Sequence, residues 1–141
     1  MKKLVYVSAF VLLVASLFTV SAVNPQKKGT ATITKLPKVE VYYFHYTRRC
    51  STCQAVETES QKAVSALYPT QLKEGKIHFQ AINLDDKGSN ILASKCKAEG
   101  QVLLVISSGK RIDLTEQGFM YALNKPEKLK AELKKTIDPL L

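Results

Sequence analysis

The chain of 141 residues has no tryptophan, only three cysteines, five prolines and six glycines. Three cysteines are too few for a small scaffold held together by several disulfides, and an odd number leaves one of them unpaired. The modest glycine and proline content excludes collagen-like and long low-complexity segments. With 45% hydrophobic and 23% charged residues, the composition is that of a globular protein, and the length predicts a single domain.

Acidic residues are also scarce, since 12 Asp and Glu face 21 Lys and Arg, for a net charge of +9. The basic residues are scattered along the chain, and no basic run interleaves with aromatic residues. We therefore expect no nucleic-acid partner, and we interpret most of the charge as solvated surface. Weak attraction to acidic partners or to membrane surfaces accounts for the remainder.

The N-terminus has the three-part pattern of a secretory signal. Basic residues at 2 and 3 precede an apolar run from Leu4 to Val20, and small residues follow up to Ala22. We expect residues 1–22 to be a signal peptide, and the mature protein to be periplasmic or secreted. The alternative is an uncleaved anchor, because this run of 17 residues is at the lower limit of length for spanning a bilayer. The membrane is then touched only through this segment.

The rest of the chain divides into a polar linker at 23–37 and a domain at 38–141. Within the domain, β-branched, aromatic and periodic apolar residues predict an alternation of strands and helices. Residues 39–46 contain a single charge and predict a strand buried on both faces. The predicted elements are a strand at 39–46, a helix from the cysteine motif to Leu67, a strand at 77–84, a helix at 90–99 with Gly100 as its cap, a strand at 102–106, a turn at 107–110, a strand at 111–114, a helical turn at 118–124 and a helix beginning at Pro126.

This order, β-α-β-α-β-β-α, predicts an α/β fold. A βαβ crossover followed by a hairpin and a helix gives a central mixed sheet with helices on both faces.

Cys50-Ser51-Thr52-Cys53 is the strongest chemical signal, because it follows the buried strand and opens a helix. Residues three apart on a first helical turn are neighbours, so the two sulfurs can bond. Unpaired N–H groups and the partial positive charge of the helix N-terminus stabilise a thiolate at Cys50. Arg48 and Arg49 add positive charge beside it. A Cys-x-x-Cys motif near a βαβ pattern indicates thiol–disulfide redox chemistry.

The strand, the Cys-x-x-Cys motif and the elements that follow resemble the thioredoxin-like superfamily over about residues 39–137. The stretch from Val41 to Cys53 resembles a narrower group, the exported thioredoxin-like proteins of Bacteroidetes-type bacteria. That group is labelled as a subunit of nitrophenyl-compound nitroreductases. The resemblance implies a thioredoxin-like fold, no bound cofactor, and a protein redox partner at the membrane.

The chain departs from ordinary thioredoxins at several positions. Arg49 stands where a tryptophan is usual, and Ser51-Thr52 replaces Gly-Pro between the cysteines. The cis-proline expected opposite the motif is replaced by Gln101 or Val102, which we assign to the groove facing the cysteines. No acidic residue under the motif is evident in the sequence. These departures argue against general thioredoxin activity and leave metal or metalloid binding open.

The resemblance implies that Cys50 is the attacking thiolate and that Cys53 is the resolving thiol. We expect Arg48 and Arg49 to tune the pKa or to steer an acidic partner. His45 is either a proton relay to a thiol or a core residue whose ring nitrogens are satisfied.

Two other functions stay open. In the first, Cys50 and Cys53 form an inert disulfide on a partner-binding scaffold. In the second, their thiolate sulfurs capture a soft metal or arsenite. Cys96 is expected to be buried and inert, with a third redox thiol or an intermolecular disulfide as the alternatives. Asp85-Asp86 predicts a turn rather than a calcium site, because the remaining ligands are missing.

Overall fold

The structure of the protein is a computed structural model that describes residues 37–141. The expected signal peptide at 1–22, and the linker up to residue 36, lie outside the described residues. Within the described part of the chain, no helix has both the length and the apolar character needed to cross a bilayer.

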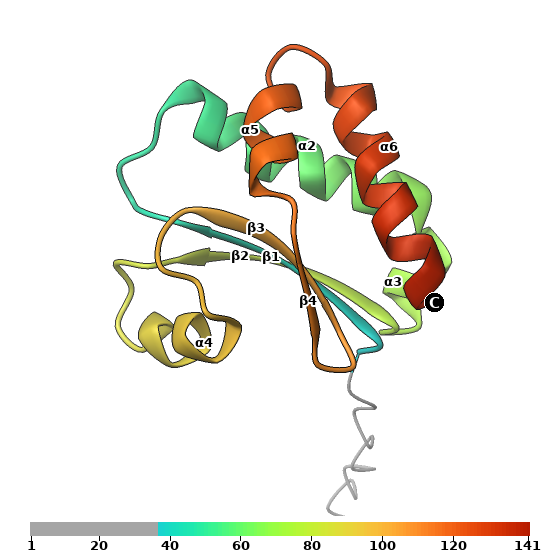
Figure 1. The fold of residues 1–141 in the computed structure, drawn as a ribbon, viewed down its shortest axis with the longest axis horizontal. Coiled ribbons are helices and arrows are strands. Elements are labelled where there is room, and N and C mark those ends of the chain that lie inside the picture. Colours follow the sequence, from blue (N-terminus) through green and yellow to red (C-terminus); the bar gives the residue numbers. More distant parts are fainter. Residues whose placement is uncertain (1–36) are drawn as a thin grey trace, which may run out of the picture. The chain divides into compact units, whose positions relative to one another are not determined.

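A four-stranded mixed sheet forms the centre of the domain (Figure 1). Its strands are β1 (Val39–His45), β2 (Ile77–Asn83), β3 (Val102–Ser107) and β4 (Lys110–Asp113), in the order β2-β1-β3-β4. β1 runs parallel to β2 and antiparallel to β3, and β3 runs antiparallel to β4. The parallel pair is joined through helices, and the antiparallel hairpin is joined by a short turn.

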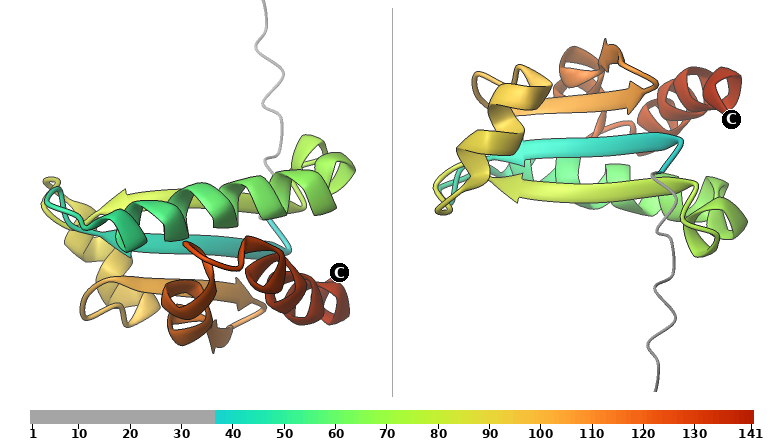
Figure 2. Two further views of the ribbon diagram at one scale, coloured as in Figure 1. Left: turned by 90° about the horizontal axis from the view of Figure 1, so that it is seen from above. Right: turned by 90° about the horizontal axis from the view of Figure 1, so that it is seen from below.

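Helices cover both faces of this sheet, as Figures 1 and 2 show. α2, α5 and α6 lie on one face, and α4 lies on the other. The helices are α2 (Ser51–Leu67), α3 (Pro69–Lys73), α4 (Ser89–Cys96), α5 (Thr115–Tyr121) and α6 (Pro126–Ile137), followed by a 3₁₀ turn at Asp138–Leu140. This arrangement confirms the predicted α/β class, and the order of strands and helices is that of a thioredoxin-like fold.

Alternate residues of β1 belong to two separate hydrophobic clusters. Val41 and Tyr43 pack in the cluster beneath α2 and α6, whereas Tyr42 and Phe44 pack in the cluster beneath α4. Side chains of a strand alternate between the two faces of its sheet, so a strand covered on both sides needs apolar residues at nearly every position. The run of aromatic and β-branched residues therefore predicted the central strand correctly.

Three helix predictions need correction, two of them around α3 and α4. Pro69 follows the end of α2 and begins the short helix α3, where the sequence predicted no element between Leu67 and residue 77. Proline is favoured at a first helical position, because its missing N–H has no partner there. α4 ends at Cys96 rather than at residue 99, because Lys97 turns into the left-handed region with φ 53°. Its N–H bonds back to the helix carbonyls of Ala93 and Ser94, so Lys97 takes the role expected of Gly100.

α5 begins three residues before the predicted helical turn at 118–124. Gly118 lies inside this helix, at its contact with α2 and β3. A Cβ on Gly118 would lie 3.2 Å from Cγ1 of Val56 and 3.3 Å from Cδ2 of Leu103. The glycine therefore permits close packing at this contact and does not mark the beginning of the helix.

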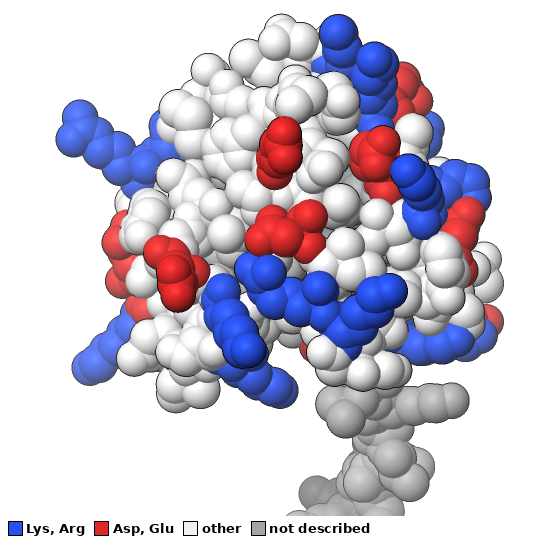
Figure 3. Space-filling view, in the orientation of Figure 1, with Lys and Arg blue, Asp and Glu red and all other residues white. Residues whose placement is uncertain are grey.

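Charged residues of both signs are mixed on the face of the domain that Figure 3 shows. On the face drawn in Figure 3, Lys and Arg are spread around the domain, and acidic residues stand among them. Several basic side chains cross the lower part of this face, close to acidic neighbours.

Candidate active site

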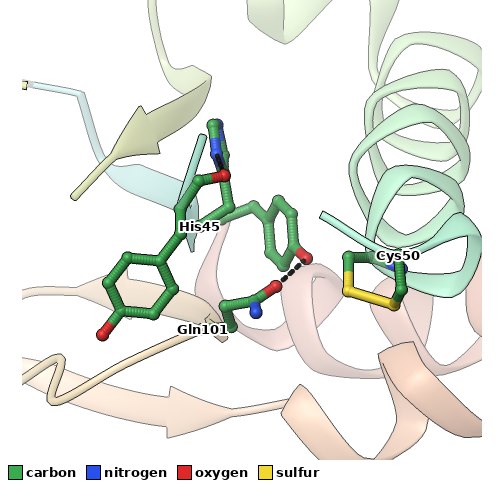
Figure 4. Close-up of a disulfide and its surroundings, with 6 residues drawn as sticks. His45, Cys50 and Gln101 are labelled. Carbon is green, nitrogen blue, oxygen red and sulfur yellow. Dashed lines mark hydrogen bonds between the residues drawn. A yellow bond between two sulfur atoms is a disulfide. The ribbon is translucent and has the colours of Figure 1, made fainter. Parts of the chain in front are cut away.

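The cysteine motif is placed by the junction between β1 and α2. Cys50 is the N-cap of α2, with extended backbone angles of φ −79° and ψ 167°. Its Sγ accepts the backbone N–H of Cys53 at 3.2 Å, in the way that a capping side chain accepts a free N–H of the first turn. The two cysteines form a disulfide, with their Cα atoms 5.1 Å apart (Figure 4). The helix start predicted from the sequence thus brings both sulfurs together.

The two cysteines differ in exposure. Cys50 is exposed, whereas only 4% of Cys53 is exposed. A partner's sulfur can therefore reach Cys50 while Cys53 stays behind it. Thiol–disulfide exchange with a protein requires one accessible sulfur and a second sulfur within bonding reach of the first.

An acidic residue that the sequence analysis did not identify lies beside the motif. Glu57, on α2, accepts a hydrogen bond from the Arg49 guanidinium, and the two form an ion pair. The same carboxylate oxygen is 3.8 Å from Nε2 of His45. Glu57 follows Cys53 by four residues, which puts the two on one face of the helix. That spacing is the signal by which Glu57 can be found in the sequence.

His45 lies at the end of β1 and is 8% exposed. Its Nδ1 is 3.0 Å from the carbonyl oxygen of Tyr46, and its ring centroid is 5.8 Å from that of Tyr43. Figure 4 shows the ring of His45 directed away from the disulfide. The observed link between His45 and the motif runs through Glu57.

Gln101 and Val102, both assigned to the groove, face different sides of the sheet. The side chain of Gln101 accepts a hydrogen bond from the Tyr43 hydroxyl at 3.4 Å, and it lies in the same close-up as Cys50 (Figure 4). Val102 instead packs against the cluster beneath α4, with Phe44. Burial raises the pKa of Tyr43 to about 12, although Arg49 opposes this shift. The hydroxyl consequently stays protonated and can donate.

The loop that carries Arg48 and Arg49 is held by the loop after β2. The backbone N–H of Thr47 donates to Oδ2 of Asp85 at 2.8 Å, and Nδ2 of Asn83 donates to Oγ1 of Thr47 at 2.9 Å. The hydrogen bond from Thr47 lowers the pKa of Asp85. Arg48, beside the motif, is exposed. Asp85 lies in a turn, as predicted. Residues 37–141 hold no group of three or more His, Cys, Asp and Glu side chains placed to bind a metal.

Cys96 lies at the end of α4, on the opposite face of the sheet from α2. It is a free thiol, 4% exposed, in the cluster formed with Tyr42 and Phe44. Burial raises the pKa of this thiol. A buried, protonated thiol separated from the disulfide by the sheet is a poor nucleophile.

No protein-family model matches the chain, and the comparison with curated proteins found no match. Among solved structures, the chain is similar to mitochondrial thioredoxin 3 of Saccharomyces cerevisiae in its oxidized form. The identity is 19% and the TM-score is 0.45, over 72% of this chain and 82% of that one. It is also similar to a structure described as a malarial protein, at 20% identity and a TM-score of 0.44, over 70% of this chain and 96% of that one. The thioredoxin-like character of the fold rests on this chain's own strand order, strand directions and helix placement.

Proposed function

We propose that this protein is an exported thiol–disulfide oxidoreductase that exchanges electrons with a protein partner through Cys50 and Cys53. The observation that carries the proposal is the pair of sulfurs at the start of α2, with Cys50 exposed and Cys53 buried behind it. The capping N–H of Cys53 and the positive end of the helix favour a thiolate at Cys50. No bound cofactor is needed.

The exchange proceeds in two steps. In the reduced protein, the Cys50 thiolate attacks one sulfur of a partner disulfide, and the other partner sulfur leaves as a thiolate. Cys53 then loses its proton and attacks Sγ of Cys50, which breaks the mixed disulfide and releases the second partner thiolate. Two electrons pass to the partner, and Cys50–Cys53 becomes the disulfide. The reverse sequence oxidises a partner dithiol and returns this protein to its reduced form.

The export and the partner in this proposal rest on the sequence. The apolar segment after Lys3 and the small residues up to Ala22 support removal of a signal peptide and a periplasmic or secreted location. The resemblance of residues 41–53 to thioredoxin-like subunits of nitroreductases supports a role beside a membrane-bound partner of that type.

Trapping of the mixed disulfide tests the proposal. With Cys53→Ser, the second step is blocked, so covalent complexes through Cys50 should accumulate in the native host. They should appear on non-reducing gels and disappear after reduction. Cys50→Ser is the matched control, and it should capture nothing. Absence of trapped complexes with Cys53→Ser would contradict the exchange role.

A glutathione redox titration separates this function from an inert disulfide. The protein is equilibrated at stated potentials, the thiols are alkylated, and Cys50, Cys53 and Cys96 are followed by mass spectrometry. We expect a reversible two-electron couple between Cys50 and Cys53, with Cys96 unchanged. A pair that stays oxidised below about −300 mV is a structural disulfide, and a partner-binding scaffold then becomes the better interpretation.

A further inference from the structure

Arg49 does not stand free beside the disulfide, although the sequence places it next to Cys50. Its guanidinium is bound by Glu57. The side chains of the two are only 23% and 27% exposed, so solvent screens this ion pair less than it screens a pair on the open surface. Glu57 follows Cys53 by four residues, one turn further along α2. The ion pair ties the guanidinium to this carboxylate, so Arg49 is not free to turn toward the Cys50 sulfur.

We propose that Glu57 is a positioning residue that makes the Cys50–Cys53 pair more reducing by binding the Arg49 guanidinium, which is then not free to turn toward the Cys50 sulfur. The inference rests on the proposed function, since it concerns the potential of the same pair. Reduction places a negative charge on Cys50, and a cation within about 4–6 Å stabilises that charge. A cysteine pair is a strong oxidant when its reduced form is stabilised in this way. An Arg49 bound to Glu57 withholds that stabilisation.

Three other groups belong to the same surroundings. His45 approaches the Glu57 carboxylate from the end of β1, with Nε2 at 3.8 Å. The Tyr43 hydroxyl feels both Arg49 and Glu57, with opposite effects on its pKa, and it is protonated at neutral pH. The buried Cys53 lies one turn before Glu57 on the same helix. Of the two arginines beside the motif, Arg49 is the one bound to Glu57, whereas Arg48 is exposed.

The reduction potential is the measurement that tests this role. Glutathione titrations are made on Glu57→Gln, Arg49→Gln and the double variant. We expect Glu57→Gln to shift the equilibrium with glutathione about three- to tenfold toward the dithiol, because it frees Arg49. A tenfold shift equals about 30 mV for a two-electron couple. Arg49→Gln should shift the equilibrium the opposite way, since it leaves the Glu57 charge unpaired. In the Arg49→Gln background, the further change Glu57→Gln should have a smaller effect than it has in the wild type.

Glu59→Gln is the matched control. Glu59 also lies on α2, its side chain is 25% exposed, and it pairs with Lys62 at 2.8 Å. It carries the same charge through a similar ion pair but does not contact Arg49, so its removal should leave the potential unchanged. A potential shifted equally by Glu59→Gln would show that any lost charge on α2 has the same effect, and would overturn the assignment.

The outcomes separate this inference from the proposed function. A wild-type protein without a reversible Cys50–Cys53 couple contradicts the function itself. A reversible couple that Glu57→Gln leaves unchanged, or shifts equally in both Arg49 backgrounds, overturns the positioning role and leaves the function standing. If Glu57→Gln does not fold, Glu57→Asp takes its place, because the shorter side chain keeps the charge but loosens the hold on Arg49. A shift toward the dithiol then supports the role, and no shift refutes it.

Discussion

A single buried hydroxyl is expected to lower the stability of this domain. Ser60 lies on the inner face of α2 and is 0% exposed. Within residues 37–141, its Oγ is the buried side-chain oxygen or nitrogen that has no hydrogen-bond partner. An unsatisfied buried polar group costs about 1–3 kcal/mol, and serine is also about 0.5 kcal/mol worse than alanine inside a helix. The space left by the missing oxygen offsets part of this gain, so we expect Ser60→Ala to raise the free energy of unfolding by about 1–2 kcal/mol.

Ser65→Ala is the matched control, because Ser65 lies on the same helix but is exposed. Its substitution changes only helix propensity, and it should stabilise by about 0.5 kcal/mol or less. Urea unfolding of the oxidised protein, with equal m-values, measures both free energies. Thermal unfolding should agree, since about 1 kcal/mol corresponds to roughly 4–8 °C in a domain of this size. If Ser60→Ala gained no more than Ser65→Ala, or lost stability, the hydroxyl would have a partner and the reasoning would fail.

Two further changes test the packing and the charges around the site's framework. Gly118→Ala should lower the free energy of unfolding by about 1 kcal/mol. The added Cβ meets Val56 and Leu103, and such overpacking costs about 1–3 kcal/mol. The higher helix propensity of alanine offsets about 1 kcal/mol of this cost. Increased stability in a urea titration would contradict that contact. Burial disfavours the charged form of Asp113, but hydrogen bonds from Thr115 and Arg111 outweigh this and hold the pKa of its carboxyl below the ordinary value. A carboxyl whose pKa is lowered by folding stabilises the fold at pH values above its unfolded pKa. This stabilisation is lost as the pH falls through the folded pKa. Asp113→Asn should therefore destabilise the protein at pH 7, and the gap to the wild type in urea midpoints should shrink below about pH 4. A gap that is the same at pH 7 and pH 3 would refute this.

The order of elements could be predicted from the sequence because it depends on local signals. The aromatic and β-branched run of β1 requires cover on both faces, and the structure supplies it with two clusters. The turn of the β3–β4 hairpin was also predicted, and there Ser108 and Gly109 both adopt positive φ, which suits a two-residue hairpin turn. The Cys50–Cys53 spacing places two sulfurs on one helical turn in any fold that begins a helix at this point.

Boundaries and charge partners could not be predicted in this way. Gly118 looks like a helix boundary in the sequence, yet it lies inside α5, where Val56 and Leu103 pack closely against it. Lys97 ends α4 although lysine rarely adopts positive φ. The packing at Gly118 depends on neighbours that are distant in sequence.

The sequence by itself determined the class of the fold, the helix start at Cys50 and the chemistry that its sulfurs can perform. The tertiary structure decided what surrounds them: the exposure of Cys50, the burial of Cys53, and the pairing of Arg49 with Glu57 beside His45. The physical reason is the distance along the chain over which each interaction acts. Helix spacing and strand alternation act over a few residues, whereas the partner of a charge and the exposure of a side chain depend on how separate elements, here the end of β1 and α2, lie against each other.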